Sequence, residues 1–126
     1  MGFVEAVRTC LAKYATFSGR ASRSEFWWFA LFHALVLVAI AVFATVSAMS
    51  DVQRVAQAVG VAGSVVYIAL ILPMLAATIR RLHDRNRSGW SYFWVLVPFV
   101  GGLIVLIWCL QRGVEGDNRF GPDPLA

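Results

Sequence analysis

Charged residues are scarce in this sequence, and they are unevenly distributed. Asp, Glu, Lys and Arg make up 14% of the 126 residues, whereas about 25% is usual in a soluble domain. None of them occurs in three long stretches, 26–50, 55–79 and 88–111. Hydrophobic residues make up 60% of the chain, against about 45–50% in soluble domains. This composition excludes a soluble globular enzyme and a disordered chain.

Cysteine and lysine are also rare. The two cysteines, Cys10 and Cys109, lie far apart and form no C-x-x-C motif, which excludes a disulfide-rich secreted domain and a cysteine-ligated metal site. We therefore predict no metal and no cofactor, and we expect both thiols to be buried as small apolar side chains. Lys13 is the only lysine, so the other ten basic residues are arginines.

The three uncharged stretches are each long enough to cross a membrane. A helix needs about 20 apolar residues to span a hydrocarbon core about 30 Å thick. None of the stretches alternates polar and apolar residues, so helices are expected rather than a β-barrel. We therefore predict an all-α membrane protein, a single membrane domain over 1–126 in which three transmembrane helices follow an N-terminal amphipathic interfacial helix. The predicted segments are the interfacial helix 1–19, the spans 23–50, 51–84 and 88–111, and a polar tail 112–126.

The third stretch permits a second interpretation. Pro98 and Gly101 interrupt it, and a proline inside a helix removes a hydrogen bond and kinks the helix. We predict a kinked span, which places Cys109 and the tail on the opposite membrane surface from Cys10. The alternative is a re-entrant hairpin, which would return the tail to the surface that holds residues 80–89 and allow the two to form one site.

Basic residues determine the expected orientation. Eight of the eleven lie in the leader before the first span or in the loop that precedes the third, and positive charge is retained at the cytoplasmic surface of membrane proteins. We expect a multi-pass protein with a cytoplasmic N-terminus and, with three spans, a C-terminus on the opposite side. The same rule accounts for the net charge of +4, so we expect no nucleic-acid partner.

Four motifs resemble those of a known family. They are FSGRASRSEFW at 17–27, RRLHDRNRSGW at 80–90, PFVG at 98–101 and GDNRFGPDP at 116–124. Together they extend over nearly the whole chain and resemble the DUF805 family of small bacterial inner-membrane proteins. The resemblance implies a helical protein of the bacterial inner (plasma) membrane, and under the predicted topology its tail would be periplasmic. It implies no activity.

Arginines and tryptophans collect at the predicted cytoplasmic surface. A guanidinium group binds two phosphate oxygens at once, which lysine cannot do, and a basic pocket between helix ends can hold a lipid head group. We therefore predict that the protein binds anionic lipid or polyprenyl-phosphate head groups in an accessory role in the envelope. The predicted head-group residues are Arg20, Arg23, Arg80, Arg81, Arg85 and Trp90. The alternative is that these arginines only determine topology.

Glu25, His83 and Asp84 are expected to support this site. Asp84 lies four residues after Arg80, a spacing that allows an ion pair on one helix face, and we expect Glu25 to pair with Arg81 between helices. His83 and Asp84 also leave open a lipid-phosphate enzyme, although no second cluster completes such a site. Three further residues mark the rigid tail, which either folds back on the helices or binds a partner: Asn118, Arg119 and Asp123.

His33 is a potentially ionisable residue deep inside a predicted span. It lies about 12 Å into the first span at 1.5 Å per residue, where a histidine serves either helix packing or proton transfer. Ala56, Gly60 and Ser64 recur every four residues, a spacing that lets two helices approach closely. We therefore expect a homo-oligomer or a partner membrane protein, and the alternative function is a small homo-oligomeric channel or a lipid or solute transporter.

Overall fold

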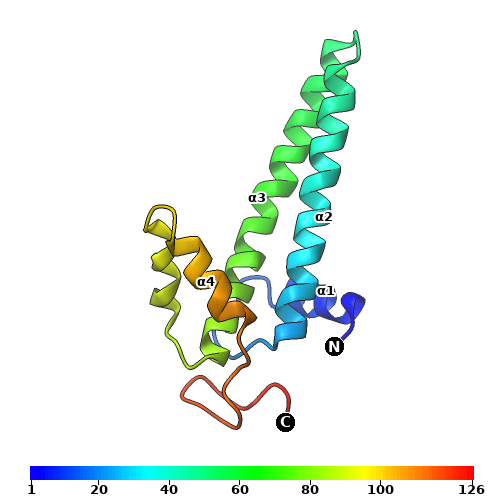
Figure 1. The fold of residues 1–126 in the computed structure, drawn as a ribbon. Helices are drawn as coiled ribbons and strands as arrows, with labels where there is room; N and C mark the ends of the chain where they lie inside the picture. Colours follow the sequence, from blue (N-terminus) through cyan, green and yellow to red (C-terminus); the bar gives the residue numbers. More distant parts are fainter.

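The computed structural model describes all residues 1–126 and is entirely helical. The elements are α1 (Phe3–Ala12), α2 (Arg23–Ala48), α3 (Gln53–Asp84), the 3-10 helix η1 (Gly89–Leu96) and α4 (Gly101–Leu110). They form a V with two arms. Antiparallel α2 and α3 make the long arm, η1 and α4 make the short arm, and the arms meet at the end of the molecule that also holds α1 and both termini (Figure 1).

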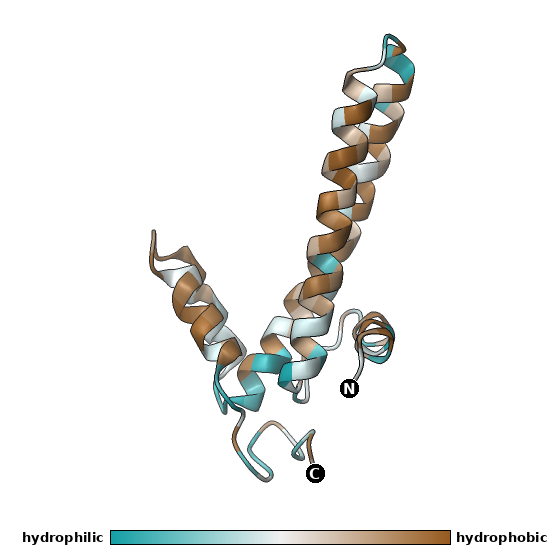
Figure 2. Ribbon diagram, turned by 45° about the vertical axis from the view of Figure 1, so that its right-hand side comes forward, coloured by the Kyte–Doolittle hydropathy of each residue, from teal (hydrophilic) through white to brown (hydrophobic).

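The long arm consists of two helices that can each cross a membrane. Their 26 and 32 residues correspond to about 39 and 48 Å at 1.5 Å per residue, and both are apolar enough to span. Few of their apolar side chains are buried within the chain, and brown apolar residues cover the arm on the visible side (Figure 2). A core helix of a soluble protein is mostly buried, so this exposure favours contact with lipid.

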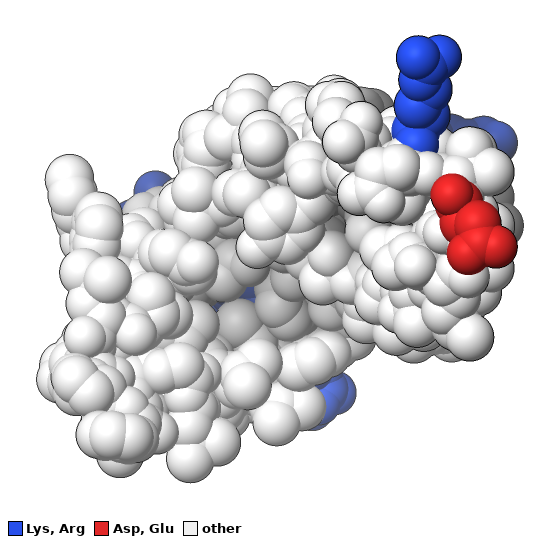
Figure 3. Space-filling model, turned by 90° about the horizontal axis from the view of Figure 1, so that it is seen from above, with Lys and Arg blue, Asp and Glu red and all other residues white.

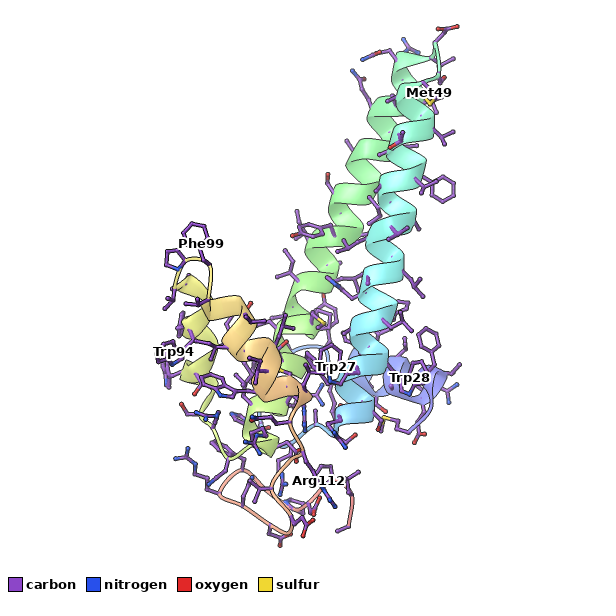
Figure 4. The ribbon with its side chains drawn as sticks, viewed as in Figure 1. Trp27, Trp28, Met49, Trp94, Phe99 and Arg112 are labelled. Atoms are coloured by element: carbon purple, nitrogen blue, oxygen red, sulfur yellow. The ribbon has the colours of Figure 1, made fainter.

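The third predicted span is not confirmed, because residues 88–111 fold in half. The chain turns between η1 and α4 at Pro98, and Phe99 has a positive φ of 69° at the tip (Figure 4). A Cβ atom on Gly101 would lie 1.7 Å from the Trp94 carbonyl oxygen, so glycine is required where the two halves approach. The ten residues of α4 extend about 15 Å, half the thickness of the hydrocarbon core. The structure therefore has the hairpin form that was the alternative interpretation.

The tail consequently returns to the start of α2. Arg20 donates to the carbonyl oxygens of Val114 at 2.6 Å and Gly116 at 2.6 Å, and both termini lie at the same end of the molecule (Figure 1). The expected separation of the tail from the N-terminal leader is therefore not found. The opposite end, where α2 turns into α3, carries Asp51 and Arg54, and most of the surface seen from above is uncharged (Figure 3).

The N-terminal helix is confirmed, although α1 ends at Ala12, earlier than the predicted segment. It lies beside the start of α2, and its Cys10 is buried. Cys10 shares one hydrophobic core with Cys109, so the prediction that the two thiols lie at opposite membrane surfaces is wrong. The hairpin explains the difference, because it returns the end of α4 to the end of the molecule that holds α1, where Phe26, Phe29 and Ala77 lie in the same core. Both thiols are free and buried, as predicted.

Candidate functional site

Five buried charged side chains occupy the junction of the two arms. We call them the arginine cluster: Arg20, Glu25, Arg80, Arg81 and Asp84. Arg80 and Arg81 have no exposed surface. Burying a charged group is unfavourable unless it is paired and hydrogen-bonded. The cluster contains three guanidinium groups and two carboxylates, so further acceptors are needed to satisfy the hydrogen-bond donors of the guanidinium groups.

Asp84, at the end of α3, holds two of these arginines. Its Oδ1 atom accepts from Arg20 Nε at 2.9 Å and lies 2.8 Å from Arg20 Nη2, and its Oδ2 atom pairs with Arg81. Gly113 packs directly against this carboxylate, since a Cβ atom there would lie 2.0 Å from Oδ2. The Val114 amide donates to the Asp84 carbonyl at 2.8 Å. Asp84 therefore joins the loop before α2, the end of α3 and the tail.

Glu25, in the first turn of α2, pairs with the third arginine. Its backbone amide donates to the Ser22 hydroxyl at 3.2 Å, which caps the helix, while its carboxylate pairs with Arg80. The expected pairs, Asp84 with Arg80 and Glu25 with Arg81, are therefore exchanged. Consecutive residues of a helix point about 100° apart, so Arg80 faces α1 and α2 while Arg81 faces α4 and the tail.

Cys10 lies beside the pair of Glu25 and Arg80. Its Sγ atom is 3.8 Å from Glu25 Oε1 and accepts from Arg80 Nη2 at 3.9 Å. Burial and the nearby Glu25 carboxylate raise the pKa of the Cys10 thiol to about 11. The thiol is therefore protonated at physiological pH, which suits a structural contact and not a nucleophile.

Backbone carbonyl oxygens accept most of the remaining guanidinium hydrogens, whereas Arg80 Nε is buried without a partner in the chain. Arg81 donates to the carbonyls of Cys109 at 3.1 Å, Ala21 at 3.1 Å and Gln111. The last carbonyls of a helix lack partners within the helix and carry partial negative charge, so Arg81 caps α4. The indole of Trp27 adds a bond to the Cys109 carbonyl at 3.2 Å. A lysine carries its three donors on one nitrogen, so it could not reach these three separate carbonyl oxygens at once.

His83 connects α3 to both flanking loops, and it does not form a catalytic pair with Asp84. Its Nδ1 atom lies 3.0 Å from the Gly19 carbonyl oxygen, to which it donates, and its ring stacks on Phe120 at 4.0 Å between ring centres. Asn118 Nδ2 donates to the His83 carbonyl at 2.9 Å. The two neighbours in sequence thus have separate partners, and the tail residue Phe120, absent from the predicted site, is part of this contact.

The other two predicted tail residues lie outside the cluster. Arg119 places its guanidinium 4.7 Å from the centre of the Phe120 ring. Asp123 accepts from the Leu125 amide at 2.9 Å and the Gly116 amide at 2.8 Å, and these bonds lower the pKa of its carboxyl group. Turns within the tail therefore fold it, and Asn118 and Phe120 attach it to His83 at the end of α3.

The structure divides the predicted head-group residues into two groups. Arg20, Arg80 and Arg81 are buried, and their polar contacts lie within the chain. Arg23 and Trp90 are exposed, while Arg85 and its neighbour Arg87 are half-buried. We call this second group the basic rim: Arg23, Arg85, Arg87 and Trp90. Sequence reasoning missed the acceptors of the buried arginines, because backbone carbonyls leave no signal in side-chain chemistry.

His33 lies apart from both groups, on α2 in the long arm. Its Nε2 atom is buried and has no hydrogen-bond partner in the chain. No three side chains of His, Cys, Asp or Glu lie close enough together to hold a metal ion. The polar chemistry of the molecule is therefore concentrated in the arginine cluster and the basic rim.

Comparison with known proteins agrees with the fold and motifs described above. The family model described as "Protein of unknown function (DUF805)" matches residues 14–122. The chain is 40% identical over 114 residues to the inner membrane protein YhaH of Escherichia coli strain K12, which covers 90% of this chain and 91% of that protein. It is 39% identical over 115 residues to the inner membrane protein YhaI of the same strain, with 90% of each chain covered.

A more distant relative is the uncharacterized protein YiiR of Escherichia coli strain K12, which is 28% identical over 134 residues and covers 86% of this chain and 85% of its own. No solved structure matches the chain. The family match covers most of the chain, including the segments that form the arginine cluster, and the similar proteins YhaH and YhaI are named for the inner membrane. The chain therefore belongs to the DUF805 family and is a small inner membrane protein.

Proposed function

We propose that the protein crosses the inner membrane twice, inserts the short arm as a re-entrant hairpin, and binds anionic lipid head groups at the basic rim in an accessory role in the envelope. The observation that supports this most is the separation of the arginines. Arg20, Arg80 and Arg81 make their contacts inside the arginine cluster, whereas Arg23, Arg85 and Arg87 have no carboxylate partner. Of these three, Arg85 also donates to the Arg112 carbonyl at 2.7 Å and to Gln111 Oε1 at 2.8 Å.

The charge distribution supports a cytoplasmic position for the end where the arms meet. Arg54 is the only basic residue near the turn between α2 and α3, and the others lie at the opposite end. Positive charge is retained on the cytoplasmic side, so this topology places both termini in the cytoplasm. It replaces the periplasmic tail that three spans would require.

The basic rim has the chemistry of a phosphate site at a membrane surface. Arg23 is exposed and makes one long bond of 3.5 Å to the Leu110 carbonyl. Arg87 stacks 4.0 Å from the centre of the Trp108 ring, which leaves the edge of its guanidinium able to donate. Trp90 is 77% exposed, and tryptophan prefers the head-group level of a bilayer. Anionic phospholipids and polyprenyl phosphates share the phosphate that this site would bind.

Two variants, one at each end of the molecule, test the proposal. The triple variant Arg23→Gln, Arg85→Gln and Arg87→Gln removes the rim, and Arg54→Gln removes a positive charge at the other end. Each basic residue at a membrane surface contributes about 1 kcal/mol to anionic lipid binding, so the triple variant should bind phosphatidylglycerol about 100-fold more weakly.

Native mass spectrometry in detergent with phosphatidylglycerol measures the retained lipid, with phosphatidylcholine as the uncharged comparison. Arg54→Gln should retain phosphatidylglycerol as the wild type does. Equal retention by the wild type and the triple variant would show that the arginines determine topology alone.

A second candidate is a homo-oligomeric channel or transporter. Gly60 and Ser64 lie on an exposed face of α3, beside Gln57, around a surface hollow of about 620 Å³. Two spans in one copy cannot enclose a pore, so this function requires association, and small residues favour close helix contact. Gly60→Leu should abolish disulfide cross-linking between Ser64→Cys copies in membranes if α3 pairs with itself. Cross-linking that is unchanged by Gly60→Leu would remove this candidate.

A further inference from the structure

A cavity lies between the two arms and extends from the arginine cluster along the long arm. Its volume is about 290 Å³, and residues from α2, α3 and η1 line it. The apolar lining consists of Ile71, Met74 and Leu75. Its polar lining comes from His33 on α2, Tyr67 and Thr78 on α3, and Tyr92 on η1. The cavity therefore exists only because the short arm folds back against the long arm.

Three of these polar side chains have no partner in the chain. His33 Nε2 is buried and makes no hydrogen bond, and Tyr14 is the only tyrosine whose hydroxyl does, to the Ala69 carbonyl. The hydroxyl of Thr78 is satisfied by the Met74 carbonyl at 2.8 Å. Unpaired polar groups are costly where no water is present. Tyr67 is 46% exposed and Tyr92 is half-buried, so the buried His33 nitrogen carries most of this cost. Its place beside two unpaired hydroxyls points to a molecule that supplies partners to all three.

The depth of its two innermost polar groups, His33 and Tyr67, excludes a phosphate head group at that end of the cavity. His33 lies ten residues beyond Arg23, and Tyr67 lies thirteen residues before Arg80, which correspond to about 15 and 20 Å along the helices. Lipid phosphates stay at the membrane surface, whereas these groups lie near the middle of a hydrocarbon core about 30 Å thick. No charged residue lines the cavity, so the occupant is neutral and soluble in lipid.

We propose that the cavity between the arms binds the ring of a membrane quinone through His33, Tyr67 and Tyr92. A quinone ring is flat and neutral and carries carbonyl oxygens on opposite edges. Tyrosine hydroxyls and an imidazole N–H donate to such oxygens, and a half-turn of the imidazole brings either ring nitrogen toward the cavity. Met74 and the two tyrosine rings offer the flat, polarisable contacts that a ring prefers. A volume of about 290 Å³ fits one ring and leaves the isoprenoid tail in the lipid.

The experiment uses decylubiquinone as the probe and the full chain in phosphatidylcholine nanodiscs. Quenching of tryptophan fluorescence is measured against quinone concentration, because a bound quinone gives a saturable component and a dissolved one gives a linear component. The double variant Tyr67→Phe with Tyr92→Phe removes two donors without changing the size of the rings. Tyr14→Phe is the matched control, since its hydroxyl is satisfied outside the cavity.

The wild type and Tyr14→Phe should show the same saturable component, and the double variant should shift its midpoint at least tenfold to higher concentration. His33→Leu should do the same, which gives a second variant if the double variant does not fold. Decanol at the same concentrations should leave the wild-type curve unchanged. A purely linear response in the wild type, a midpoint unaffected by both variants, or displacement by decanol would each overturn the proposal. None of these outcomes depends on the basic rim.

Discussion

The two ends of the long arm are stabilised by opposite means. Where the arms meet, the arginine cluster is buried, and tail carbonyls and two carboxylates accept from most of its guanidinium donors. Toward the turn at Met49, apolar side chains such as Phe43 and Val61 are largely exposed (Figure 4). The first end is held by contacts within the chain, and the second requires lipid. Substitutions in the arginine cluster should therefore affect the stability of the protein in any solvent. The effect of substitutions near the turn at Met49 should depend on the membrane.

The largest effect is expected for Asp84→Asn. This change removes the charge that compensates Arg20 and Arg81, and breaking a buried ion pair usually destabilises a protein by about 3–5 kcal/mol. Unfolding in detergent, followed by circular dichroism against temperature, measures the loss. The control is Glu115→Gln at the exposed pair with Arg112, for which at most about 1 kcal/mol is expected. Similar losses in the two variants would contradict a stabilising role for the buried cluster.

A somewhat smaller effect is expected for Phe99→Asp at the tip of the short arm. Placing an aspartate at the centre of a membrane costs about 2.5–3.5 kcal/mol, so this variant should insert poorly if the hairpin enters the bilayer. Met49→Asp, at the turn of the long arm, should be tolerated because it lies at the surface. The measurement is the amount of each protein in the membrane fraction. Normal insertion of Phe99→Asp would place the short arm outside the hydrocarbon.

Gly113→Ala is expected to destabilise the contact between the tail and Asp84. The new Cβ atom would lie 2.0 Å from the Asp84 carboxylate, and such overpacking costs about 1–3 kcal/mol. The tail should become sensitive to limited proteolysis. Gly102→Ala is the control, since nothing lies within 4 Å of a Cβ atom there and alanine favours a helix. A tail equally resistant in both variants would show that Gly113 has room to shift.

The smallest effect concerns Cys10 and appears only at alkaline pH. Its pKa is raised from 9.0 to about 11 by burial and by Glu25, so the folded state favours the protonated thiol. The stability that this contributes is present below pH 9 and is lost as the pH rises from 9 to 11. In a Cys109→Ala background, denaturant unfolding at pH 8 and pH 10.5 measures the difference. Adding Cys10→Ala should reduce the loss, and an unchanged loss would assign it to other groups.

The long arm could be predicted from the sequence, whereas the short arm could not. Uncharged stretches of 25 residues predict helices because length and hydropathy suffice. Hydropathy cannot show whether Pro98 kinks a helix or ends it. That outcome depends on how closely Gly101 approaches the Trp94 carbonyl, a contact between residues that the pattern of apolar side chains does not connect.

The gathering of arginines at one end was predicted, but their burial was not. Arg20, Arg80 and Arg81 were expected to face ligands. Arg20 and Arg81 face carbonyls of α4 and the tail instead, and Arg80 faces Glu25 and Cys10. The carbonyls belong to residues such as Val114 and Gly116, whose side chains carry no signal for this contact. The fold-back of the short arm brings these carbonyls into reach, so the missed hairpin and the missed burial have the same cause.

The most direct test of the account is the side of the membrane on which each end of the molecule lies. Single cysteines at Ser50 and Glu115, in a background with Cys10→Ala and Cys109→Ala, can be labelled with an impermeant maleimide from either face. The account predicts that Glu115→Cys reacts from the cytoplasmic face together with Arg8→Cys, and that Ser50→Cys reacts from the periplasmic face. Reaction of Glu115→Cys and Ser50→Cys from the same face would contradict it, because residues 88–111 would then cross the membrane.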